Sequence, residues 1–107
     1  MESAPHNPFA GEVGLVIDGQ PHVCKLTLGA LAELEVTLST DTLVELVKRF
    51  ENGRFSTRDV LALIVAGLRG GGWQGKAHDL VHAEIEGGIV RAAEAAAELL
   101  ARAFTAP

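Results

Sequence analysis

The spacing of hydrophobic residues changes once along the chain, near Leu26. Before this point apolar residues alternate with others, at Val13, Leu15 and Ile17. This two-residue period predicts a β-strand, and the following Asp18-Gly19 pair favours a tight type I′ hairpin turn. Beyond Leu26 the apolar residues recur every three or four positions, which is the period of an amphipathic helix. The pattern therefore predicts a β-hairpin over residues 12–28, followed by helices.

The register of this hairpin follows from the turn. With Asp18 and Gly19 as the two loop residues, Ile17 faces Gln20 and Val13 faces Cys24. One face of the hairpin is then apolar, with Val13, Leu15, Ile17, Cys24 and Leu26. Pro21 falls opposite Val16, where its missing N–H would point away from the partner strand, so we expect a sheet edge there. Two strands alone are marginal in water, and helices are the expected cover.

Helical spacing continues to the end of the chain, interrupted by glycine and polar breaks. We predict helices over residues 29–36, 41–52, 57–69, 76–86 and 89–104. The most specific local signal is a capping box formed by Ser56 and Asp59, with Phe55 and Val60 placed as a hydrophobic staple. The helix that it opens is apolar over more than half its circumference, which predicts the central buried helix. The last helix is rich in alanine, which has high helix propensity and lets helices approach closely.

These elements define one domain of the α+β class. We expect a flexible arm over residues 1–10 and a single domain over residues 11–107, in which the N-terminal hairpin packs against four to five helices. The chain has 107 residues, enough to bury a core without disulfides or metals. Hydrophobic residues make up 48% and aromatic residues 5%, so this core must be mainly aliphatic.

Charge and cysteine content narrow the class of function. The formal net charge of -5 argues against nucleic acid as a partner, because phosphate binding needs clustered Lys and Arg. Cys24 is the only cysteine, which rules out an intramolecular disulfide and fits a reducing cytoplasm. We find no secretory signal pattern, and the longest apolar run, from Val60 to Leu68, is too short to cross a membrane.

No group of residues in the sequence has the pattern of a catalytic, cofactor or metal site. His78 and His82 lie four residues apart, with Glu86 one turn further, but no other ligands complete a zinc site, and a solvated polar stripe is the better interpretation. The glycine-rich segment from Arg69 to Gly75 follows a helix rather than a strand, which favours a loop over a phosphate site. We therefore predict a non-enzymatic protein without cofactors.

Three further features have alternative interpretations. The two helices around Glu51 to Ser56 are spaced like a helix-turn-helix, but the supposed reading helix becomes wholly apolar after Asp59, so a DNA-binding regulator is a distant alternative. Trp73, in the glycine-rich loop, is either an exposed anchor for a protein partner or a cover over the helix ends. Cys24 is expected to serve packing rather than reactivity.

Several short motifs resemble those of a known family. They are G-E-V at residues 11–13, L-T-L-G-A-L-A-E-L-E at 26–35, G-L-R-G at 67–70, Gly87-Gly88 and L-L-A-R-A-F at 99–104. With these, the chain resembles the small tail assembly chaperone-like proteins of gene transfer agents and related tailed phages, also described as gene transfer agent tail proteins. The resemblance covers nearly the whole chain. It departs at residues 72–76, where similar proteins usually begin a helix with acidic residues or serine.

The resemblance implies a cytoplasmic assembly factor that binds the tail tape-measure protein and helps recruit tail-tube protein. Self-association is a further option. A helical protein with an aliphatic groove could shield the apolar helices of a tape measure. We expect the partner surface to combine the glycine-rich loop with the last helix, through Arg69, Trp73, Ala93, Ala97, Leu100 and Phe104. The alternative is a structural tail-tube or tail-completion protein that stays in the particle.

Overall fold

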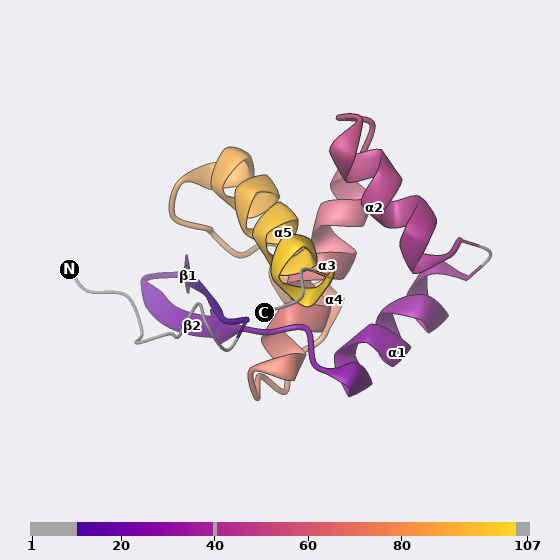
Figure 1. Ribbon diagram of the computed structural model, residues 1–107. Coiled ribbons are helices and arrows are strands. Elements are labelled where there is room, and N and C mark those ends of the chain that lie inside the picture. The colour runs from indigo at the N-terminus through magenta and orange to yellow at the C-terminus, as the bar shows by residue number, and fades with distance from the viewer. Residues whose placement is uncertain (1–10, 40, 105–107) are drawn as a thin grey trace.

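The computed structural model describes residues 11–39 and 41–104, which form a hairpin followed by helices (Figure 1). The predicted arm, residues 1–10, lies outside the described residues. The elements are β1 (Val13–Ile17), β2 (Gln20–Cys24), α1 (Leu28–Leu38), α2 (Leu43–Glu51), α3 (Thr57–Gly70), α4 (Ala77–Val81) and α5 (Gly88–Phe104). The α+β class, with an N-terminal hairpin on a mainly helical body, is confirmed.

The hairpin has the register that the turn predicted. Val13 pairs with Cys24, Ile17 with Gln20, and Pro21 lies opposite Val16. Asp18 and Gly19 have φ angles of 51° and 77°, as the two central residues of a type I′ turn require. The alternation therefore places the side chains of Val13, Leu15, Ile17 and Cys24 in the core.

Side-chain caps fix where the first three helices begin. Thr27, Thr42 and Ser56 each accept a hydrogen bond from a backbone N–H of the turn that follows. At Ser56 the capping box is complete, because the Asp59 side chain accepts from the Ser56 backbone N–H at 2.9 Å. Helix α2 begins two residues later than predicted because the Thr42 cap precedes Leu43, and α1 runs two residues further, to Leu38.

The predicted helix over residues 76–86 is wrong beyond Val81. Helix α4 has five residues, and the chain then becomes extended beside β1. Ile85 forms an antiparallel bridge with Ile17, and the Glu86 N–H donates to the Val16 carbonyl at 2.9 Å. These bonds satisfy backbone groups on the free edge of β1, which outweighs the weak helical pattern of this segment.

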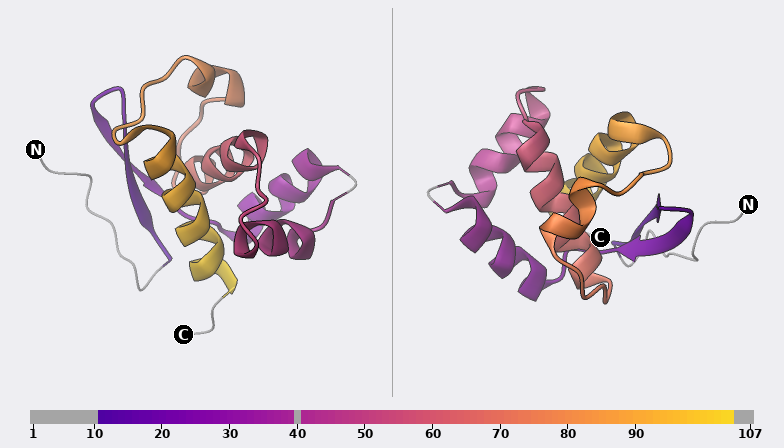
Figure 2. Two further views of the ribbon diagram at one scale, coloured as in Figure 1. Left: turned by 90° about the horizontal axis from the view of Figure 1, so that it is seen from above. Right: turned by 180° about the vertical axis from the view of Figure 1, so that it is seen from behind.

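Helix α3 is the centre of the fold and packs against α1, α5 and β2 (Figures 1 and 2). Glycines in α3 allow this close packing against α5 and the end of β2. A Cβ atom at Gly67 would lie 2.7 Å from Leu99 of α5, and one at Gly70 would lie 1.9 Å from the carbonyl oxygen of Lys25. The Lys25 N–H in turn donates to the Gly67 carbonyl at 2.8 Å. At the end of α3, the helix backbone therefore lies in direct contact with the backbone of the chain at the end of β2.

Candidate docking surfaces

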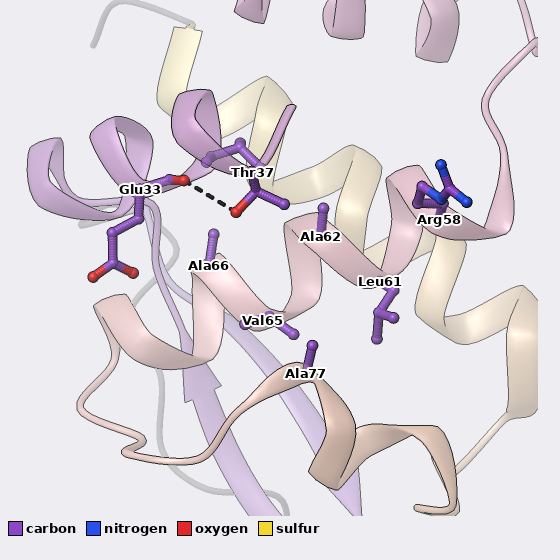
Figure 3. Close-up of a pocket in the computed structure, with 9 residues that line it drawn as sticks. Glu33, Thr37, Arg58, Leu61, Ala62, Val65, Ala66 and Ala77 are labelled. Carbon is purple, nitrogen blue, oxygen red and sulfur yellow. Dashed lines mark hydrogen bonds between the residues drawn. The ribbon is translucent and has the colours of Figure 1, made fainter. Parts of the chain in front are cut away.

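One hollow on the described surface is a groove between α1 and α3 (Figure 3). We call it the α1–α3 groove. Its apolar lining comes mainly from one face of α3, where residues spaced three and four apart align: Leu61, Ala62, Val65 and Ala66. Leu34 of α1 and Ala77 of α4 complete the apolar part, and the hollow has a volume of about 150 Å³. It continues past Val36 into a second, more open hollow of about 350 Å³.

Charged side chains surround this groove. Glu33, which lines the groove, forms an ion pair with Arg69 of the second hollow, with Arg69 Nε 2.9 Å from Glu33 Oε1. Arg58 lines the groove and Lys76 lines the second hollow, and within residues 11–39 and 41–104 neither forms an ion pair. The rim therefore has an excess of positive charge, although the whole chain is acidic.

Arg69 and Trp73, both predicted to bind a partner, lie together beside the groove. Arg69 is exposed and also donates to the Gly75 carbonyl at 3.1 Å, which ties the glycine-rich loop to α3. Trp73 is half-buried and packs against the core, with its indole ring lying over Gly75. Sequence analysis offered an exposed anchor or a cover over the helix ends, and Trp73 is neither fully exposed nor free of the core.

The other predicted partner residues lie on α5. Ala97 and Phe104 are exposed and Ala93 is half-buried, and together with Val90 and Ala101 they form what we call the α5 outer face. Leu100 does not belong to it. Only 3% of Leu100 is exposed, because its position on the helix turns the side chain into the core beside Leu99. Leu100 is therefore a core residue, and the prediction of it as a surface residue is not supported by its burial.

The two halves of the predicted partner surface do not merge into one. The side-chain partners of Arg69 are Glu33 on α1 and Gly75 in the loop. Helix α5 instead packs at Gly67, on the face of α3 opposite Leu61 and Val65. The structure thus separates the groove with its loop from the α5 outer face.

The histidines do not form a metal site in the described part of the chain. The rings of His78 and His82 lie 6.3 Å apart, edge to face. Helix α4 ends at Val81, so Glu86 is not on the same helix face, and its backbone instead pairs with β1. No group of three potential metal ligands occurs among the described residues.

Two buried polar groups are explained by the fold. Burial raises the pKa of the Cys24 thiol to about 12, which keeps it protonated and suits the packing role expected for it. Burial also opposes ionisation of Asp59, but hydrogen bonds from Arg49 and Ser56 outweigh it and hold the pKa of Asp59 below its ordinary value. Asp59 is thus occupied in joining α2 to α3.

Sequence reasoning did not identify the α1–α3 groove. The signal was present in the unusually wide apolar surface of the helix that begins after Ser56. One side, with Val60, Leu63 and Ile64, is buried in the core, and the opposite side lines the groove. Periodicity shows that a helix has two apolar sides, but only the packing shows that one of them lacks a complete cover.

The fold and its surfaces define a small α+β protein with exposed apolar surfaces. Within the described residues, no helix has the length and apolar character needed to span a membrane. The comparison with protein families matches residues 10–106 to the family described as phage tail tube protein, GTA-gp10. The chain therefore belongs to this family of gene transfer agent and phage tail proteins. Neither the curated proteins nor the solved structures give a match.

This family description bears on the two tail functions considered above. It supports a structural role in a phage-like tail, which sequence reasoning ranked second, better than the chaperone role that it ranked first. A tail protein is expected to have partners within the tail, but the match does not extend to binding of a tape-measure protein.

Proposed function

We propose that this protein is a structural subunit of a phage-like tail, as a tube or tube-completion protein of a gene transfer agent or prophage. The observation that carries the proposal is the family match, which covers residues 10–106 of a 107-residue chain. On this proposal the chain is made in the bacterial cytoplasm, performs no catalysis, and is incorporated into the particle next to other tail proteins.

The surfaces support this function in a simple geometric way. A subunit within a tube must contact at least two neighbours, so it needs two binding surfaces that do not overlap. The α1–α3 groove and the α5 outer face lie on opposite sides of α3. Both places carry exposed apolar residues, such as Val36 with 81% and Phe104 with 51% exposed.

A second candidate, the tail assembly chaperone, is favoured by one observation about the sheet. The described sheet has two strands, and other chain segments contact part of each of its edges. Beside β1 the Asp18 N–H donates to the Glu84 carbonyl at 2.7 Å, and beside β2 the end of α3 approaches Lys25. These contacts occupy part of the edges that a larger ring of strands would need. A protein that instead docks helices could shield a tape-measure protein before the tube forms.

The two candidates differ in where the protein is found after assembly. The test is quantitative mass spectrometry of purified particles from a strain that produces them, with the cell lysate measured in parallel. A structural subunit is expected at a fixed ratio to the other tail proteins, at several copies per particle. Known head and tail proteins of the same particles serve as internal standards.

Absence of the protein from purified particles would contradict the structural proposal. If the protein is abundant in the lysate but absent from purified particles, the structural proposal fails. Capture of the tape-measure protein by the tagged chain from that same lysate would then establish the chaperone role. A gene deletion that removes tails, rescued by the wild-type gene, confirms in either case that tail formation requires the protein.

A further inference from the structure

Residues 76–86 form a peripheral segment between two glycines, which we call the strap. It contains α4 and the extended residues beside β1, and it connects the glycine-rich loop to α5 (Figure 2). Gly75, just before it, accepts a hydrogen bond from Arg69 of α3, and Gly87, just after it, lies against Arg91 of α5. Gly87 has a φ of 89°, which glycine adopts at little cost, so the strap can pivot there.

The strap contributes little to the core. Leu80 is its only buried residue, with 7% exposed, while Ala83 and Ile85 are half-buried and the other strap residues are exposed. Helix α4 packs against α3 alone among the helices that it contacts closely. Because segments with few buried side chains open at a lower free energy than the core, the strap is expected to be the least stable part of the described fold.

Asp18, in the hairpin turn, attaches the strap to β1 through both its backbone and its side chain. The Asp18 N–H donates to the Glu84 carbonyl at 2.7 Å, and the Glu84 N–H donates to Asp18 Oδ1 at 2.8 Å. A third bond runs from the Glu86 N–H to the Val16 carbonyl at 2.9 Å. Asp18 and both glutamates are exposed, so water can compete for these bonds.

Other contacts of the hairpin do not involve the strap. Arg91 of α5 donates to the Gly14 carbonyl at 2.6 Å, and the Lys25 N–H donates to the Gly67 carbonyl of α3 at 2.8 Å. Strand β1 also packs against α5, and β2 against α3. The hairpin therefore has attachments to the helices that remain when the strap moves away.

We propose that the strap opens and closes as one unit, held shut by Asp18, while the hairpin, α3 and α5 stay folded. In the open form the Val16 carbonyl and the Asp18 N–H, on the outer edge of β1, lose their partners and are exposed to solvent. Leu80 leaves the core, and Ala77 leaves the lining of the α1–α3 groove. The strap thus controls access to one edge of the sheet. This property does not depend on the tail role proposed above.

Native-state hydrogen exchange of the full chain, followed for single amides by NMR at low urea concentrations, tests this opening. The amides of Asp18 and Glu86 report the strap, because bonds between the strap and β1 protect them, and the Lys25 amide reports the core. After correction for intrinsic rates, the two strap amides should exchange together and at least about tenfold faster than Lys25. Asp18 is the decisive marker, because it belongs to the hairpin in sequence but should exchange with the strap.

Two substitutions at Asp18 separate the side-chain bond from the turn. Glycine and asparagine both suit a type I′ turn, but only asparagine keeps an oxygen that can accept from the Glu84 N–H. Asp18→Gly should speed exchange at Glu86 at least about tenfold, as expected for a lost hydrogen bond to a charged group, and Asp18→Asn should have a smaller effect. Ser56→Ala is the matched control. It removes the cap of α3, which the open form retains, so it should speed exchange at Lys25 several-fold and leave Glu86 unchanged.

A disulfide can lock the strap shut. Val16 and Glu86 lie opposite each other where the strap pairs with β1, at a separation that a disulfide can span. In the variant with both Val16→Cys and Glu86→Cys, oxidation should slow exchange at the Asp18 amide to the rate of Lys25. Reduction of the same sample should restore the faster exchange, so each sample serves as its own control.

Three results would overturn the inference. The first is equal exchange of the Asp18 and Lys25 amides in the wild-type chain, which would mean that the strap opens only with the whole fold. The second is an effect of Ser56→Ala on Glu86 as large as its effect on Lys25. The third is an oxidised variant in which the Asp18 amide still exchanges faster than Lys25, because opening of the strap would then not be the event that exposes it.

Discussion

Arg49 and Asp59 join the second and third helices through a pair of parallel hydrogen bonds, each 3.0 Å long. Arg49 Nε donates to Asp59 Oδ2 and Arg49 Nη2 donates to Asp59 Oδ1. The same carboxylate accepts from the Ser56 N–H and thereby caps α3. One side chain thus fixes both the start of α3 and its position relative to α2, which sets the orientation of the helix that lines the α1–α3 groove.

Replacement of Asp59 should therefore destabilise the fold more than replacement of an exposed aspartate. We expect Asp59→Asn to lower the free energy of unfolding by about 1–3 kcal/mol, because it breaks a charged bidentate pair at a nearly buried site. Urea unfolding measures the change. Asp41→Asn is the control, since Asp41 contacts the same Arg49 at 3.3 Å but is 46% exposed, and it should cost less than about 1 kcal/mol. Equal losses for the two variants would contradict the central role of Asp59.

The Asp59 carboxylate should make the free energy of unfolding depend on pH under acidic conditions. The pKa of Asp59 is lower in the folded protein than in the unfolded chain, so the unfolded chain binds more protons between the two values. Its contribution is complete above about pH 4, the ordinary pKa range of aspartate, and is lost as the pH falls through the folded pKa. The stability difference between wild type and Asp59→Asn should be flat from pH 7 to about 4 and shrink below. A difference that grows towards low pH would contradict this sign.

Gly70 should not tolerate a side chain. A Cβ there would lie 1.9 Å from the Lys25 carbonyl oxygen, a backbone atom that cannot move without displacing β2. We expect Gly70→Ala to lower the free energy of unfolding by about 1–3 kcal/mol, as for overpacked cores. Gly29→Ala, in α1 where a Cβ would lie 3.9 Å from the Thr27 hydroxyl, should be neutral or stabilising by up to about 1 kcal/mol. Thermal and urea unfolding compare the two, and tolerance of Gly70→Ala would refute the close packing.

Cys24 should be unreactive in the folded state. Burial raises the pKa of its thiol to about 12, so almost no thiolate exists at pH 8, and the side chain is inaccessible. A thiol-disulfide reagent should label the native protein only at the rate of unfolding or local opening. In guanidinium chloride, where the thiol pKa returns to about 8.5, labelling should be rapid. Fast labelling of the native protein at pH 8 would show that the core around Cys24 opens readily.

Leu100 and Phe104 are both predicted from sequence for the partner surface, but their replacement by alanine should have different effects on the free energy of unfolding. Leu100→Ala creates a cavity in the core and is expected to cost about 2–5 kcal/mol. Phe104→Ala removes an exposed ring and is expected to change the free energy of unfolding by less than about 1 kcal/mol. Guanidinium unfolding of both variants checks this. A large loss for Phe104→Ala would mean that the ring packs within its own chain and cannot serve another.

What the sequence alone determined is mostly local. The Asp18-Gly19 turn fixed the hairpin register, and Ser56 and Asp59 fixed the start of α3, because each depends on backbone geometry within a few residues. The short motifs, the best of them at residues 26–35, also sufficed to recognise the tail family.

Tertiary structure decided what depends on neighbours distant in sequence. Residues 82–86 left the helical pattern because the free edge of β1 offered hydrogen bonds to Glu84 and Glu86. Leu100 and Phe104 share one helical period, yet only the packing of α5 on α3 buries the first and exposes the second. The groove exists because α1 and α4 cover one side of α3 incompletely, and periodicity carries no information about such incomplete cover.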